Sequence, residues 1–134
     1  MNWTKPQALK PALGSLAAVL AIGAAEPRLL AAAEGGLWEV SVSARGQAAR
    51  NICLANPVEL AVWEHRGARC TRDIIADEGD RATIHYTCAK GGFGRSDMTL
   101  LTPRSLRIAT QGISDGAPFN YVLHARRVGN CARR

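Results

Sequence analysis

Four cysteines constrain this chain more than any other feature of its sequence. They stand at positions 53, 70, 88 and 131 of 134 residues, and no two of them form a Cys-x-x-Cys pair. That spacing gives no indication of a zinc ribbon or a thioredoxin-type redox site. In a small exported chain, four cysteines instead predict two disulfides, which can be paired in three ways. Whether the chain is exported is therefore the first question.

The N-terminus has the three regions of a secretory signal peptide. Residues 1–10 contain two lysines and no acid, residues 13–25 form an uncharged, alanine-rich run, and small residues follow. The run is too short to cross a bilayer, which takes about 20 apolar residues. Cleavage rules fit two sites, after Ala33 and after Ala25. We favour Ala33 because Gly36 begins the first clear strand, although the charged segment between the two sites argues for the earlier one.

Cleavage after Ala33 leaves residues 34–134 as one small domain, of a size at which disulfides commonly supplement a thin core. The full chain has 17 Lys and Arg residues against 11 Asp and Glu residues, a formal net charge of +6. Acids are interleaved with the cations, which favours solubility and weak attraction to anionic surfaces rather than nucleic-acid binding. We expect a periplasmic protein that does not span the membrane after cleavage.

Residues 34–134 alternate apolar and polar side chains between short turns, the pattern of an antiparallel all-β domain. About seven short strands joined locally predict a meander that closes into a small barrel or curls as a half-barrel. The segment 57–66 breaks the alternation and predicts one short helix. Asn56 can cap it, Pro57 suits its first position and Gly67 can end it.

The hairpin with its turn at residues 78–80 predicts one disulfide. A three-residue loop there sets Cys70 opposite Cys88 and gives chemically matched pairs along both strands. A two-residue loop would move the cysteines apart. Directly opposed residues have Cα atoms roughly 4.5 Å apart, within disulfide range. We therefore predict the pairs Cys70–Cys88 and, from the two cysteines that remain, Cys53–Cys131.

The first strand of the domain predicts a second hairpin. Trp38, Val40, Val42 and Ala44 share one face of this strand, and Arg45-Gly46 follows as a tight turn. A two-residue loop sets Trp38 opposite the cysteine at position 53. The indole would then pack against a disulfide.

Landmarks at both ends of the domain together resemble a known pattern. They are Gly36-Leu37-Trp38-Glu39, Cys53-Leu54, the cysteines Cys70 and Cys88, and Ala125-Arg126-Arg127-Val128-Gly129-Asn130-Cys131. This order resembles the bacterial exported family called domain of unknown function 3617. The chain departs from that family at Ala55, where threonine is usual, and at Asn130, where aspartate is common. The resemblance implies a periplasmic β domain of a Gram-negative bacterium, and it implies no established activity.

The polar residues indicate no catalytic or metal site. His65, His85 and His124 are too scattered for metal-ligand spacing, and the chain has no Gly-x-Ser-x-Gly elbow. His85 faces Asp73 in the predicted hairpin, which we interpret as an exposed ion pair. The glycine-rich segment 89–94 lacks the helix and the Gly-Lys-Ser/Thr end of a phosphate loop, so we interpret it as a wide turn. We predict no cofactor and no metal.

Two surfaces remain as candidates for binding. A patch for an anionic partner would comprise the arginines near the last two strands: Arg104, Arg107, Arg126 and Arg127. The inward face of the curled sheet would either line a ligand cavity or form the core, with Trp38, Met98, Leu100, Phe119 and Tyr121.

These surfaces lead to three functional hypotheses. The first is a non-catalytic binding or interaction module, whose partner is a periplasmic protein or an anionic envelope surface. The alternative is a carrier of a small apolar or lipid-like ligand inside the sheet. The third is an enzyme without a recognisable motif.

Overall fold

The computed structural model describes residues 28–132, which form one seven-stranded antiparallel sheet and two short helices. Residues 1–27, most of the predicted signal peptide, lie outside the described residues. In chain order the elements are α1 (Arg28–Ala32), β1 (Gly36–Ser41), β2 (Arg50–Leu54), the 3₁₀ helix η1 (Pro57–His65), β3 (Cys70–Glu78), β4 (Arg81–Cys88), β5 (Phe93–Thr102), β6 (Ser105–Ser114) and β7 (Ala117–Gly129).

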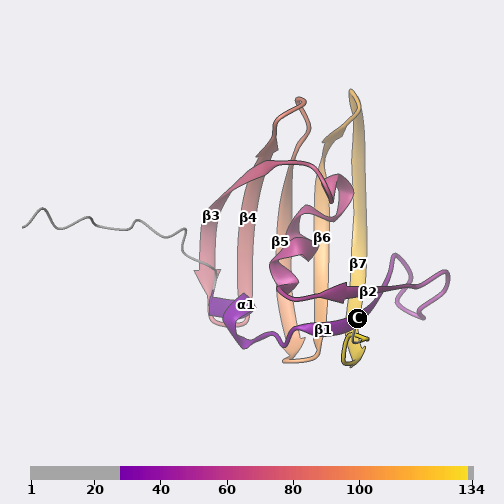
Figure 1. Ribbon diagram of the computed structural model, residues 1–134. Helices are drawn as coiled ribbons and strands as arrows, with labels where there is room; N and C mark the ends of the chain where they lie inside the picture. The colour runs from indigo at the N-terminus through magenta and orange to yellow at the C-terminus, as the bar shows by residue number, and fades with distance from the viewer. Residues whose placement is uncertain (1–27, 133–134) are drawn as a thin grey trace, which may run out of the picture.

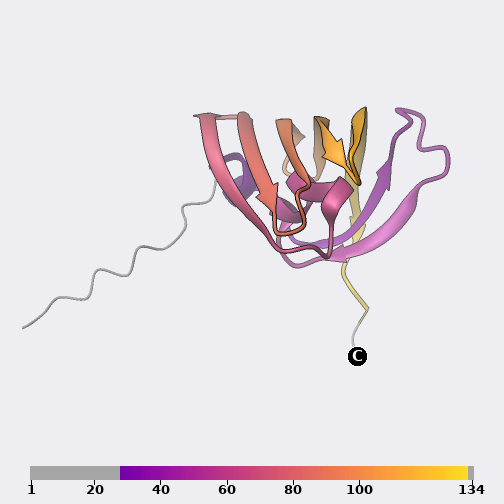
Figure 2. The same cartoon turned by 90° about the horizontal axis from the view of Figure 1, so that it is seen from above.

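The sheet is curled but open, so of the two predicted forms, a closed barrel and a curled half-barrel, the closed barrel is wrong. Its strand order is β2-β1-β7-β6-β5-β4-β3, and every pair is antiparallel. The five strands β3 to β7 form a meander, and β1 adds to β7 from the other end of the chain. Closure would require β2 to pair with β3. These two strands are instead connected by η1, which lies under the sheet against β4, β5 and β6 (Figures 1 and 2).

One face of the sheet, here called the inner face, carries the hydrophobic core. Both helices lie on this side (Figure 2). The helix η1 contributes Leu60 and Ala61, and α1 contributes Leu29 and Leu30, all at most 3 % exposed. They pack against alternate residues of the strands, among them Trp38, Val40, Leu54, Ala82, Ile84, Met98, Leu106, Ile108, Leu123 and Ala125.

The helix predicted at residues 57–66 is present as η1, but it is a 3₁₀ helix rather than an α-helix. The side chain of Asn56 accepts a hydrogen bond from the backbone N–H of Val58 at 3.0 Å, as an N-cap does. Val62 interrupts the helix with φ −116° and ψ 29°. A short 3₁₀ helix is common as a connector between elements, and here one side of the helix is buried against the sheet.

The β3–β4 hairpin follows the predicted register from Cys70–Cys88 to Ile74–Ile84 and then departs from it. Ile75 forms a bulge, and beyond it Glu78 faces Arg81 across a two-residue turn. Gly79 has φ +66°. A glycine at the first position of a two-residue turn matches the twist of the flanking strands, so the bulge absorbs the residue that the longer loop would have used.

The predicted register of the β1–β2 hairpin is wrong by one residue. Leu37, and not Trp38, faces Cys53. The strand ends at Ser41, and residues 42–49 form a loop rather than a tight turn. The hydroxyl of Ser41 donates to the carbonyl of Gln47 at 2.6 Å, which holds this wider loop. The buried Trp38 indole donates to the carbonyl of Glu34 at 3.0 Å, so the indole N–H has a partner.

Two disulfides close the structure, in the pairing expected from the sequence. Cys70–Cys88 joins opposed residues of β3 and β4, with Cα atoms 4.0 Å apart. Cys53–Cys131 joins β2 to the segment after β7, with Cα atoms 5.5 Å apart. Two disulfides indicate an oxidising compartment outside the cytoplasm. Within residues 28–132, no helix has the length and apolar character needed to span a membrane.

The segment before β1 packs onto the fold. Leu29 is fully buried and Leu30 is 3 % exposed, and the backbone N–H of Arg28 donates to the Asp77 carboxylate at 3.1 Å. Cleavage after Ala33, the favoured site, would remove this helix and its two core leucines. Cleavage after Ala25 would keep it.

Candidate ligand-binding groove

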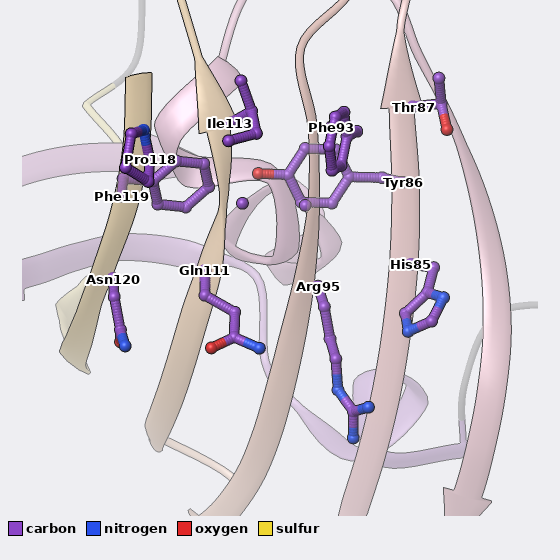
Figure 3. A pocket seen from close by; sticks show the side chains of 12 residues that line it. His85, Tyr86, Thr87, Phe93, Arg95, Gln111, Ile113, Pro118, Phe119 and Asn120 are labelled. Atoms are coloured by element: carbon purple, nitrogen blue, oxygen red, sulfur yellow. The ribbon is translucent and has the colours of Figure 1, made fainter. Parts of the chain in front are cut away.

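The face opposite the core, here called the outer face, is not covered by any element among residues 28–132 (Figure 2). A hollow with a volume of about 710 Å³ lies on it. This hollow, here called the groove, crosses β4, β5, β6 and β7 near the turns that join β4 to β5 and β6 to β7 (Figure 3). Its volume is within the range of small-molecule sites, roughly 300–1,000 Å³.

Two rows of outward-facing side chains form the walls of the groove. Each row contains one residue from each of the four strands, and its members are directly paired across the sheet. One row is largely apolar: Thr87, Phe93, Ile113 and Pro118. The other row is polar: His85, Arg95, Gln111 and Asn120.

The floor of the groove is backbone. Between the two rows lies a third set of paired residues, Tyr86, Gly94, Gly112 and Phe119, whose side chains point to the inner face. A Cβ on Gly94 would lie 2.6 Å from the Tyr86 hydroxyl oxygen, and a Cβ on Gly112 would collide with the Phe93 carbonyl. Only glycine fits these two positions because the space on their inner side is already filled. The floor is smooth because no residue of this row places a side chain on the outer face.

The polar wall carries positive charge. Arg95 binds Asp97 on the same strand, with Nη2 3.1 Å from Oδ1 and Nε 3.2 Å from Oδ2. Burial raises the pKa of Asp97, but hydrogen bonds from Arg95 and Thr83 and the charges of Arg95 and His85 outweigh it, so the pKa is lowered. No carboxylate lines the groove itself. Asp97 offsets part of the Arg95 charge, so the site favours a hydrogen-bond acceptor through the remaining donors of the wall, and an anionic acceptor before a cation.

A polar cluster lies beneath the floor. The Tyr86 hydroxyl is 3.1 Å from Nδ1 of His65, and the His65 ring contacts the edges of Tyr86 and Phe119. Nε2 of His65 is buried and has no hydrogen-bond partner among the described residues. Nearby, the Tyr121 hydroxyl donates to Glu64 at 2.7 Å. Burial and this bond raise the pKa of Tyr121. The cluster supports the floor rigidly from the inner side.

The five residues expected to line a cavity or form the core belong to the inner face. Trp38 and Met98 are buried in the core, and Leu100 and Tyr121 are half-buried against it. Phe119 is half-buried below the groove floor. The space expected for an apolar ligand is thus filled by these side chains and by η1.

The four arginines of the expected anionic-partner patch do not form one surface. Arg104 binds Glu34 at 3.2 Å, and Arg126 binds Glu39 at 2.9 Å. Arg127 is largely covered: its Nε donates to the Gly35 carbonyl at 2.8 Å and its Nη2 donates to Asn130 at 2.6 Å. Only Arg107, on the outer face, has no ion pair within the described part of the chain. The neighbouring acids therefore weaken this patch as an anion site.

Sequence reasoning missed the groove, although one signal was present. Its walls come from alternate residues of four strands, and none of them belongs to a catalytic or ligand-binding motif. The signal was the register itself, because Phe93 and Ile113 alternate with Gly94 and Gly112 at matched positions. Asp73 and His85 are directly opposed across β3 and β4 as expected, at the rim of the groove, but they form no ion pair within residues 28–132.

Comparisons with known proteins add no assignment. No protein-family model, no curated protein and no solved structure matched this chain.

Proposed function

We propose that this protein is an exported, non-catalytic binding module of the bacterial periplasm, and that the groove is its binding surface. One observation carries the proposal: the inner face is filled by core side chains, whereas the outer face has an open hollow with one apolar wall and one polar wall. Small-molecule sites combine apolar surface with a few placed polar groups in this way. The two disulfides support the periplasmic location.

The filled interior argues against the alternative, a carrier that holds an apolar ligand inside the sheet. A ligand there would have to displace η1, whose Leu60 and Ala61 are fully buried. Moving Leu60 and Ala61 out of the core would expose apolar surface whose burial stabilises the fold. Binding on the outer face requires no such change.

We also propose that the chain is a divergent member of the family domain of unknown function 3617. The support is spatial: the segments that carry the resemblance at the two ends of the domain pair as β1 and β7. Glu39 binds Arg126, Arg127 holds the Gly35 carbonyl, and Cys53–Cys131 closes the same corner. The landmarks at the two ends of the domain thus have a structural reason to accompany one another.

The binding proposal can be tested by NMR with a library of small fragments. The protein is labelled with ¹⁵N in its glycines and in its tryptophan indoles. We expect binding fragments to move the signals of Gly94 and Gly112, which form the groove floor. The Trp38 indole N–H reports the interior. Gly67 serves as the control, because it lies in a turn and no atom is within 4 Å of the place where its Cβ would be.

Two results would contradict the proposal. Fragments that move the Trp38 indole while the groove glycines stay fixed would indicate the carrier. A library in which no fragment moves Gly94 or Gly112 would remove the groove as a binding site.

A further inference from the structure

We infer that the groove selects small molecules that carry a carboxylate on a planar aromatic ring. This inference rests on the proposed function, because it names the ligand class of the same site. It follows from three features of the groove: a flat floor, an exposed aromatic wall, and a polar wall with positive charge and no acid.

The floor and the apolar wall fit a planar ring. The two walls are two residues apart along each strand, roughly 7 Å, and the floor between them is backbone with two glycines. Arg95, Gln111 and Asn120 lean away from Phe93 (Figure 3), which widens this space enough for a flat ring to lie on the floor. Phe93 is 49 % exposed and stands beside Ile113 at one side of this space (Figure 3). Aromatic rings favour offset or edge contacts with such a partner.

The polar wall fits a carboxylate. Arg95, Gln111 and Asn120 extend from neighbouring strands toward the side away from Phe93 (Figure 3). Arg95 uses Nε and Nη2 for Asp97, and its Nη1 makes no hydrogen bond among residues 28–132. The amides of Gln111 and Asn120 likewise have no partner in that range. A carboxylate would accept bonds from these donors, and bonds to charged groups are the stronger ones.

The charge also sets the order of affinity among ligands of one shape. An ammonium group at the same place would face the Arg95 guanidinium and would find no carboxylate in the lining. A neutral hydroxyl would accept a bond but would lose the attraction of the charge. The order expected is therefore carboxylate, then alcohol, then ammonium.

The test uses three probes with one ring system: 2-naphthoate, 2-naphthalenemethanol and 2-naphthylmethylammonium. Affinities are measured at pH 7.5 from the NMR shifts of Gly94 and Gly112 in the exported, disulfide-bonded protein. We expect 2-naphthoate to bind about fivefold more tightly than the alcohol, the size of effect that a half-exposed charge supplies. Decanoate tests the ring, because an alkyl chain has no aromatic face to contact Phe93, and it should bind more weakly than 2-naphthoate.

Two matched pairs of variants locate the effect. Arg95→Gln should remove the preference for the carboxylate, whereas Arg107→Gln, an outer-face arginine beyond the groove, should keep it. Phe93→Ala should lower the affinity for all three probes. Leu101→Ala, on the same strand and 62 % exposed, should leave these affinities unchanged. All four side chains are exposed, so the variants should fold.

The outcomes separate this inference from the proposed function. Equal binding of carboxylate and alcohol at Gly94 and Gly112, a preference that survives Arg95→Gln, or equal binding of decanoate would each overturn the ligand class while the groove remains a binding site. If none of these probes moves the groove glycines, the ligand class is wrong, and the fragment library then decides whether the groove binds at all.

Discussion

On the inner face of the central strands, Met98, Ile108 and Leu123 are paired side by side and at most 1 % exposed. On the outer face, the residues that precede or follow them along the chain are half-buried or exposed, and they include the charged Asp97 and Arg107. The same three strands thus have one face that carries the packed core and one that contacts solvent. Stability is concentrated on the inner face, so the outer face can change its side chains for binding at little cost to the fold.

The largest predicted loss of stability comes from a disulfide, and it is an exception to the contrast between buried and exposed residues. Cys53 is exposed, and its bond to Cys131 connects the edge strand β2 to the end of the chain. Replacing both cysteines by serine should lower the free energy of unfolding by about 4–5 kcal/mol, because the bond closes a long loop. Removing Cys70–Cys88, which closes a short loop, should cost about 3 kcal/mol. Urea unfolding measures both, and a larger loss for the short loop would contradict the argument.

A pair of leucines tests the contrast directly. Leu106 on the inner face is 1 % exposed and Leu101 is 62 % exposed. Leu106→Ala should destabilise the protein by about 2–5 kcal/mol, because it leaves a cavity in the core. Leu101→Ala should change stability by no more than about 0.5 kcal/mol. Similar losses in urea unfolding would mean that the outer face is covered in solution.

The burial of helix α1 leads to a prediction about the cleavage site of the signal peptide. Leu29 and Leu30 are in the core, so we expect cleavage after Ala25 and a mature chain that begins at Glu26. Intact-mass analysis of the exported protein identifies that residue. A protein produced from Glu34 onward should have a free energy of unfolding that is lower by about 2 kcal/mol. This loss is smaller than the burial of two leucines alone would give, because the folded protein no longer has to order the helix α1. An exported protein that begins at Glu34 would contradict this prediction.

The Tyr121–Glu64 bond gives a smaller effect that depends on pH. Burial first, and then the bond to Glu64, raise the pKa of Tyr121 in the folded state above the ordinary value of 10.0. Its contribution to stability is therefore present below about pH 10 and is lost as the pH rises toward the folded-state pKa. Tyr121→Phe should cost about 1 kcal/mol at pH 7 and should reduce the alkaline loss. Urea unfolding between pH 8 and pH 11 measures this, and an unchanged alkaline loss would exclude Tyr121 as its source.

Asp97 on the outer face should show the smallest effect. Its pKa is lowered in the folded state, so its contribution is present above its ordinary value of 3.8 and is lost as the pH falls through the folded-state pKa. The side chain is 49 % exposed, so Asp97→Asn should cost less than about 1 kcal/mol. Thermal unfolding between pH 2 and pH 7 should show a weaker acid loss in this variant. Asp80→Asn, in an exposed turn, is the control and should leave the acid loss unchanged.

Short-range pairing was predictable from the sequence, and pairing that depends on loops was not. The strands β3 and β4 have matched chemistry at every opposed position down to Ile74, so their register follows from the side chains. For β1 and β2, the loop 42–49 decides the register, and its hydrogen bond from Ser41 to Gln47 leaves no pattern in the sequence. Barrel closure depended on where η1 would lie, which alternation along the strands does not report.

The groove was harder to predict because no segment contains it. Each strand supplies one residue to each wall, and Phe93 alone reads as an ordinary exposed side chain. Only the combined register of four strands places Phe93, Ile113 and Pro118 beside one another. The glycine pair Gly94 and Gly112 was visible in the sequence, but its meaning depends on Tyr86 lying beneath it.

The nested order of the disulfides has a consequence for biogenesis. A chain delivered N-terminus first presents Cys53 and Cys70 to an oxidase before either native partner has emerged, so oxidation in order of appearance would join the wrong pair. The strand β1 likewise has only β2 as a neighbour until β7 arrives, close to the last residue of the chain. For a chain exported in this way, the native pairing needs either Cys53 and Cys70 to stay reduced until Cys88 has emerged and paired with Cys70, or a thiol–disulfide exchange that replaces Cys53–Cys70.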